Sequence, residues 1–170
     1  MFSRVLAKSS SALRRSVHTE NRIKELGYTL PGVAAPKGNY RNSVRSGNMI
    51  FTAGHLPQPA GGDLVKGKIG DDLTIDQGYE AAQHCALALC ATLKHELGDL
   101  DKVKRIVKVV GFVNCVDGFT AQPQVINGAS DTLGKIFGER GVHSRSAVGT
   151  NALPLGVAVE VECIVEVEDN

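Results

Sequence analysis

The 170-residue chain contains no tryptophan, two methionines and few aromatic residues, which make up 5% of the sequence. No apolar run approaches the roughly 20 residues that a membrane-crossing helix needs, so we expect no spanning segment and no membrane partner. The five histidines have no metal-ligand spacing and the four cysteines form no CxxC pair, so no metal site is predicted. The strained GxSxG context of a hydrolase serine is also missing, which argues against a Ser-His-Asp triad.

The residue types that are abundant fit one globular domain, since 42% of the residues are hydrophobic and 22% are charged. Beyond residue 19, acids outnumber bases, and no basic cluster is interleaved with aromatic residues. The sequence therefore argues against a nucleic-acid partner. All the cysteines lie within apolar helix or strand patterns, which favours buried, reduced thiols over disulfides. They are Cys85, Cys90, Cys115 and Cys163.

The N-terminal stretch MFSRVLAKSSSALRRSVHT is basic, rich in serine and free of acids. Apolar residues are scattered through it but form no uninterrupted run, which argues against a secretory signal. This composition is typical of a mitochondrial transit peptide. We therefore predict a transit peptide over residues 1–18 and a location in the mitochondrial matrix. The alternative is a disordered tail.

Periodicity and capping patterns predict the elements of the remaining chain. A short helix with Thr19 as its N-cap should end near Gly27, and a Pro- and Gly-rich linker should run to residue 37. The first long helix has the clearest start, because Thr74 and Gln77 form a capping-box pattern. We expect long helices near 74–98 and 122–138, and strands near 40–45, 49–53, 103–115, 145–150 and 157–167.

This order of elements favours an α+β fold, in which two long helices cover one face of a mostly antiparallel sheet. The other face of such a sheet is not stable as an apolar surface in water, so we expect self-association. Residues 19–37 form the N-terminal helix and linker in this interpretation, and residues 38–170 form the main domain.

The segment HSRSAVGTNALPLGVAVEVECI combines an arginine, a strand, a Leu-Pro turn and alternating valines and glutamates. With RSGNMIFTAGHLP and GDLDKVKRIVKVVGFV, it resembles the RidA/YjgF family of reactive-intermediate deaminases, formerly called L-PSP endoribonucleases. NGASDTLGKIFGERGVHSRSAVG is similar to a divergent branch of that family. The resemblance covers residues 38–168. It implies a chorismate-mutase-like fold, a homotrimer with clefts between subunits, and hydrolysis of 2-imino acids of the 2-aminoacrylate type to 2-keto acids and ammonia. No cofactor is expected.

Arg145 is the residue whose own chemistry agrees with this resemblance. A guanidinium pairs with a carboxylate through two charge-assisted hydrogen bonds, so Arg145 would hold a small 2-imino or 2-keto acid in a subunit cleft. The resemblance implies that Glu160 and a backbone carbonyl near Ala147 orient the attacking water. It also implies that Tyr40 contacts the ligand.

The sequence departs from the family pattern at two places. The usual SGQ after the second strand is AGH here, so Ala53 has no hydroxyl and His55 takes the place of an amide as a ligand contact. The family's helix asparagine matches either Asn127 or Ser130, and we assign Asn127 to the site. Three functions stay open: an imine deaminase, a catalytically silent trimer that binds small carboxylates or partner proteins, and an endoribonuclease. The acidic composition argues against strong RNA affinity.

Overall fold

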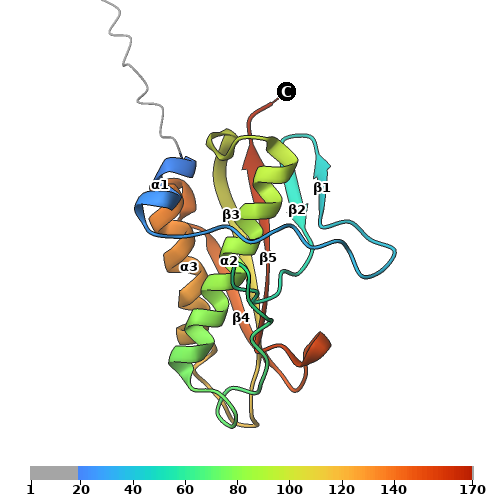
Figure 1. The fold of residues 1–170 in the computed structure, drawn as a ribbon, viewed down its shortest axis with the longest axis vertical. Helices are drawn as coiled ribbons and strands as arrows, with labels where there is room; N and C mark the ends of the chain where they lie inside the picture. Colours follow the sequence, from blue (N-terminus) through green and yellow to red (C-terminus); the bar gives the residue numbers. More distant parts are fainter. Residues whose placement is uncertain (1–18, 170) are drawn as a thin grey trace, which may run out of the picture.

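The computed structural model describes residues 19–169, and the predicted transit peptide lies outside the described residues. Its elements follow the predicted order (Figure 1). They are α1 (Thr19–Glu25), β1 (Ser43–Ser46), β2 (Met49–Thr52), α2 (Ile75–Leu97), β3 (Val103–Asn114), α3 (Gln122–Phe137), β4 (Ser144–Thr150) and β5 (Val159–Val167). Short 3-10 turns follow α2 at Leu100–Lys102 and α3 at Gly138–Gly141, and a third precedes β5 at Pro154–Gly156. None of the helices within residues 19–169 is long and apolar enough to cross a bilayer.

The five strands form one sheet in the order β1-β2-β5-β3-β4. All neighbouring pairs are antiparallel except β3 and β4, which are parallel because the connection between them passes through α3. Both long helices cover one face of this sheet (Figure 1). The predicted α+β architecture is therefore confirmed.

Strand β1 begins later than predicted, and this moves Tyr40 out of the sheet. The ladder between β1 and β2 starts at the pair Ser43 and Thr52. One more backbone bond joins Ala53 N–H to the Asn42 carbonyl, after which the two chains separate. Tyr40 therefore lies in the bend before β1, where its side chain is 54% exposed.

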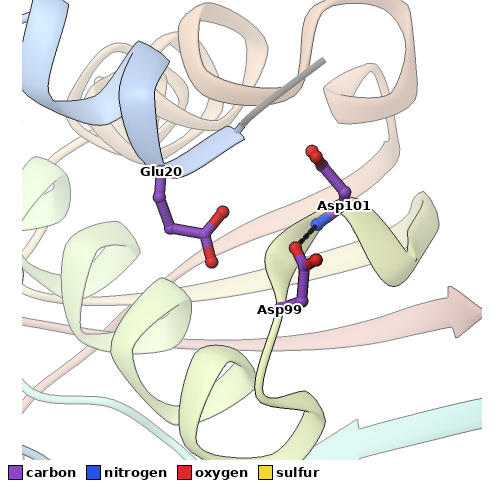
Figure 2. Close-up of side chains that lie close together, drawn as sticks. All are labelled: Glu20, Asp99 and Asp101. Carbon is purple, nitrogen blue, oxygen red and sulfur yellow. Dashed lines mark hydrogen bonds between the residues drawn. The ribbon is translucent and has the colours of Figure 1, made fainter. Parts of the chain in front are cut away.

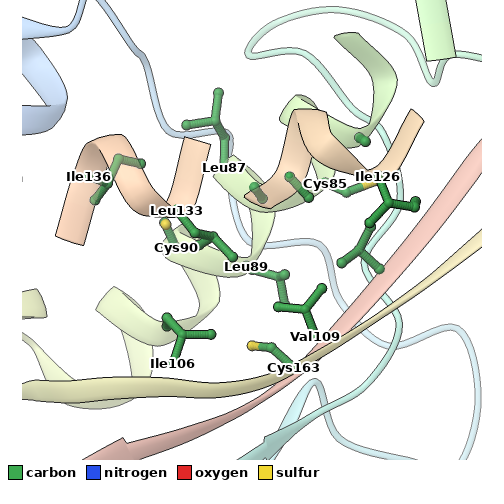
Figure 3. Close-up of a cluster of buried hydrophobic side chains, with 14 of the residues drawn as sticks. Cys85, Leu87, Leu89, Cys90, Ile106, Val109, Ile126, Leu133, Ile136 and Cys163 are labelled. Carbon is green, nitrogen blue, oxygen red and sulfur yellow. The ribbon is translucent and has the colours of Figure 1, made fainter. Parts of the chain in front are cut away.

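The side chains of β5 alternate between the two faces of the sheet. Its odd-numbered residues are buried beneath the helices, whereas its even-numbered residues are half-buried on the face without helices, which we call the open face. Figure 3 shows part of the core, in which leucines of both helices meet branched residues of β3. The four cysteines are free and buried, as the sequence predicted. Burial raises the pKa of the Cys163 thiol to about 12, so it stays protonated.

Helix α2 begins and ends where its caps predict. Thr74 Oγ1 accepts a hydrogen bond from Gln77 N at 3.2 Å, and Gln77 Oε1 accepts one from Thr74 N at 2.9 Å. At the other end, Gly98 adopts a left-handed conformation with φ of 76° and donates to the Lys94 carbonyl at 2.8 Å.

Helix α3 is held close to its neighbours by glycines. A Cβ atom at Gly128 would overlap the backbone carbonyl of Tyr79 in α2, and one at Gly111 in β3 would overlap the side chain of Ile126. The two missing side chains let α3 pack directly on α2 and β3. The position of α3 also fixes the place of Asn127, which lies beside Gly128.

Candidate functional site

Arg145 lies near the start of β4, on the side of the sheet that faces α3. Its Nη1 donates to Asn127 Oδ1 at 2.9 Å and to Ser130 Oγ at 2.9 Å, and its Nη2 donates to the Pro123 carbonyl at 3.3 Å. These three α3 residues are spaced by four and three positions, so they share one face of the helix. The structure thus brings Arg145 together with Asn127 and also with Ser130, the two alternatives that the sequence left open.

The guanidinium keeps one edge available. Both hydrogens of Nη1 and one of Nη2 are used on α3, while Nε–H and the second Nη2–H have no partner among residues 19–169. Nε and Nη2 form the edge of a guanidinium that pairs with both oxygens of a carboxylate, and Nη2 makes only one of its two possible donations here. Arg145 also lines an open groove of about 650 Å³ that includes Ser130 and His143. Arg145 is therefore fixed in place and still able to bind a carboxylate.

Ala147 lies two residues after Arg145 on β4, so both side chains are on the same side of the sheet. It pairs with Gly111 of β3 and is half-buried. Strand β4 is at the edge of the sheet, and an edge strand leaves alternate backbone groups without a ladder partner. A carbonyl on this strand is a suitable place for an exposed acceptor.

Glu160 belongs to β5 and lies on the open face of the sheet, opposite to Arg145. In the sheet register it is the neighbour of Phe112, whereas Arg145 is aligned with Val109, three positions away along β3. The Glu160 carboxylate lies against Gly54, where a Cβ atom would overlap it. Burial raises the pKa of Glu160, and the neighbouring Glu162 carboxylate raises it further. A half-buried carboxylate of this kind is suited to accept a proton.

Tyr40 and His55 line one cavity of about 120 Å³ together with Gly54. The chain segment 31–35 and Thr92 of α2 complete its walls. The Tyr40 hydroxyl accepts a weak hydrogen bond from Lys37 N at 3.4 Å. Because Gly54 lies beneath the Glu160 carboxylate and also borders the cavity, these residues form one local group.

His55 is more constrained than a ligand contact requires. Its Nδ1 lies 2.8 Å from the Ala53 carbonyl and its Nε2 lies 2.7 Å from Thr92 Oγ1. A carbonyl can only accept, so Nδ1 carries the proton and Nε2 accepts the threonine hydrogen. Burial lowers the pKa of His55, which favours this neutral form. Both ring nitrogens are thus occupied, and His55 connects the end of β2 to α2.

The sequence-predicted residues fall into two groups. We call Arg145, Asn127 and Ala147 the arginine half-site, and Glu160, Tyr40 and His55 the glutamate half-site. Arg145 and Glu160 are on opposite sides of the sheet within one chain, because Arg145 faces α3 and Glu160 is on the open face. His55 itself lies on the helix side, where it bonds to Thr92 of α2.

Two residues that contact the half-sites were not identified from the sequence. His143 contacts Ser130, and its position two residues before Arg145, directly before β4, is a signal that could have indicated it. Gly54 lies within the AGH segment, but its contact with Glu160 joins residues more than 100 positions apart. That contact follows from the sheet order and has no local sequence signal.

A cluster of three carboxylates lies away from both half-sites. Ligand oxygens of Glu20, Asp99 and Asp101 lie within 4.8 Å of one another (Figure 2). Each carboxylate already accepts a hydrogen bond: Glu20 from Leu100 N, Asp99 from Asp101 N, and Asp101 from Thr19 at both its backbone nitrogen and its hydroxyl. The cluster attaches α1 to the turn after α2, which is a structural role.

The fold defines a small α+β protein of the chorismate-mutase-like class. In its arginine half-site, α3 fixes the Arg145 guanidinium on the edge strand β4. The family model described as "YjgF/chorismate_mutase-like, putative endoribonuclease" matches residues 20–167. The chain belongs to this YjgF/RidA family. The match begins within α1 and so includes the segment before β1.

Individual proteins agree with this assignment. "Protein TCP17" of Trypanosoma cruzi is 45% identical over 148 residues, which span 86% of this chain and 92% of that protein. The crystal structure of Atu1372 from Agrobacterium tumefaciens, described as a protein of unknown function, has a TM-score of 0.82 and 41% identity, covering 90% of this chain and 96% of that one. RidA from an Antarctic Psychrobacter has a TM-score of 0.56 and 23% identity, covering 79% and 94%, and shares the fold.

Proposed function

We propose that this protein hydrolyses 2-imino acids of the 2-aminoacrylate type to 2-keto acids and ammonia. The observation that carries the proposal is that three hydrogen bonds from Nη1 and Nη2 fix Arg145 on α3, while its Nε–H has no partner within residues 19–169. An arginine that only decorated the surface would not need three fixed partners. Such a fork selects a planar carboxylate and holds the adjacent imine carbon still.

Glu160 supplies the proton transfer in this proposal. Water attacks the imine carbon and Glu160 accepts a proton from that water. Glu160 passes this proton to the nitrogen as the C=N bond becomes a single bond. Collapse of the resulting amino alcohol forms the keto C=O bond and releases ammonia. The raised pKa of Glu160 supports this role, because a carboxylate with a higher pKa accepts a proton from water more readily.

We further propose that the protein acts as a homotrimer in the mitochondrial matrix. Arg145 and Glu160 lie on opposite sides of one sheet, so a site that uses both needs a second copy of the chain. Apolar side chains on the strands also support association, since Val44, Phe51 and Val148 are 55%, 45% and 44% exposed. The basic, acid-free stretch before residue 20 supports the location.

The test is keto-acid release when the purified protein is added to a pyridoxal-phosphate-dependent serine dehydratase reaction. Wild type should accelerate release, and Arg145→Ala should lower kcat/KM by about a hundredfold or more, because a partly desolvated two-pronged pair is lost. Lys104→Ala, which removes an exposed cation of β3, is the matched control and should behave as wild type. Wild type that binds pyruvate without accelerating release would indicate the silent binding module instead.

A further inference from the structure

A chain of hydrogen bonds runs from Arg145 away from the ligand edge. Arg145 Nη1 donates to Ser130 Oγ at 2.9 Å, and Ser130 Oγ lies 3.1 Å from His143 Nε2. His143 Nδ1 lies 2.6 Å from the Gly141 carbonyl. The chain thus connects β4 to α3 and back to the turn that precedes β4.

The chemistry of these groups fixes where the protons lie. The Gly141 carbonyl only accepts, so His143 carries its proton on Nδ1. Arg145 only donates, so the Ser130 oxygen accepts from Arg145 and gives its own hydrogen to His143 Nε2. Every bond of the chain is then satisfied with a neutral imidazole. A second proton on Nε2 would leave the serine hydrogen without an acceptor in the chain and would place two cations on one hydroxyl oxygen.

The surroundings of His143 also oppose its charged form. Burial lowers the pKa of His143, and the positive charge of Arg145 lowers it further. The charged groups that line the same groove are Arg22 of α1, Asp131 and Lys135 of α3, and Arg145 of β4. Its one carboxylate, Asp131, accepts the hydroxyl hydrogen of Tyr79 at 2.9 Å, which leaves the groove dominated by cations.

We propose that His143 is a positioning residue for the ligand-binding arginine, acting through Ser130 to hold the guanidinium with its Nε–Nη2 edge open. The inference rests on the proposed role of Arg145 in carboxylate binding. It adds a role for His143, which does not contact the carboxylate in that proposal. Neutral His143 keeps Ser130 oriented as an acceptor for Arg145.

A pH dependence follows by linkage. Carboxylate binding uses the position of Arg145 that neutral His143 maintains, so binding favours the neutral form of His143. By reciprocity, a proton on His143 weakens carboxylate binding. Affinity for a 2-keto acid should therefore decrease as the pH falls through the range in which His143 titrates.

The experiment measures pyruvate affinity in variants of the full chain. His143→Ala should weaken binding near neutral pH by roughly fivefold to tenfold, since one hydrogen bond that supports a charged group is lost. His143→Gln should restore most of the affinity, because its amide oxygen can accept the Ser130 hydrogen, but the affinity should no longer fall through the range in which His143 titrates. Unchanged affinity in His143→Ala would overturn the inference.

Nitrogen NMR of the ligand-free protein separates this inference from the proposed function. His143 should be the Nδ1–H tautomer, and the Arg145 Nε–H signal should shift in His143→Ala more than in His143→Gln. If wild type binds no pyruvate, the proposed function fails, and these signals still decide whether His143 positions Arg145. An Nε2–H tautomer, or an Arg145 signal that is the same in all variants, would refute it.

Discussion

At the scale of single residues, the candidate site depends on the contacts that hold the Arg145 and Glu160 side chains in position. Arg145 is held by three partners on α3, and Glu160 by its contact with Gly54. Gly54, the central residue of the AGH segment, therefore matters because it has no side chain. This lack of a Cβ leaves the space that the Glu160 carboxylate occupies.

Gly54→Ala should displace the Glu160 carboxylate while leaving Arg145 untouched. Gly54 has no positive φ, so the added methyl acts through its overlap with the Glu160 side chain, whose flexible end can move aside. We expect keto-acid release to fall by about a hundredfold, as for other misplaced catalytic groups, with pyruvate affinity unchanged. Gly32→Ala is the control, because Gly32 lines the same cavity and has open space at its Cβ. Equal turnover in wild type and Gly54→Ala would contradict this role of Glu160.

Acid should destabilise the folded protein through its histidines. The pKa values of His55, His84 and His143 are lowered from the ordinary 6.5, mainly by burial. Below pH 6.5 the unfolded chain binds protons that the folded chain does not, so the free energy of unfolding should decrease as the pH falls from 7. Urea unfolding across this range measures the effect. His55→Gln should reduce the pH dependence, and a slope identical to that of wild type would show that His55 is not held neutral.

At the scale of elements, local patterns were predictable and long-range contacts were not. The bounds of α2 could be predicted because Thr74, Gln77 and Gly98 act within a few residues of the helix ends. The alternation of β5 likewise predicted its buried face. The link between Arg145 and Asn127 was not predictable from spacing, because it depends on how closely α3 packs on α2. Gly128 permits the close approach of α3 to α2. The sequence around a helical glycine does not indicate which neighbouring backbone it contacts.

Gly128→Ala should therefore destabilise the protein by about 3 kcal/mol, the upper end for overpacking, because the methyl meets the Tyr79 backbone, which cannot rotate away. Gly134→Ala, in the same helix, is the matched control. Its Cβ would have no neighbour within 4 Å, so alanine should stabilise α3 by roughly 0.5–1 kcal/mol through higher helix propensity. Urea unfolding at one fixed protein concentration measures both. A Gly128→Ala variant as stable as wild type would contradict the close packing of α3 on α2.

At the scale of the whole molecule, the sheet has two faces with different tasks. The helix face carries the core and holds Arg145, while the open face carries Glu160 and exposed apolar side chains. One chain therefore presents two separate halves of a site. Association of copies would cover the apolar residues and join an arginine half-site to the glutamate half-site of a neighbour.

The most direct test of this account is activity in hybrid oligomers of two inactive variants. Arg145→Ala and Glu160→Gln chains with different tags are coexpressed, and oligomers that carry both tags are purified. In a threefold ring of mixed chains, one of the three sites receives an intact half from each variant, so about a third of wild-type keto-acid release should return. Each variant alone should stay inactive. Hybrids that are no more active than the parent variants would contradict a site shared between two copies of the chain.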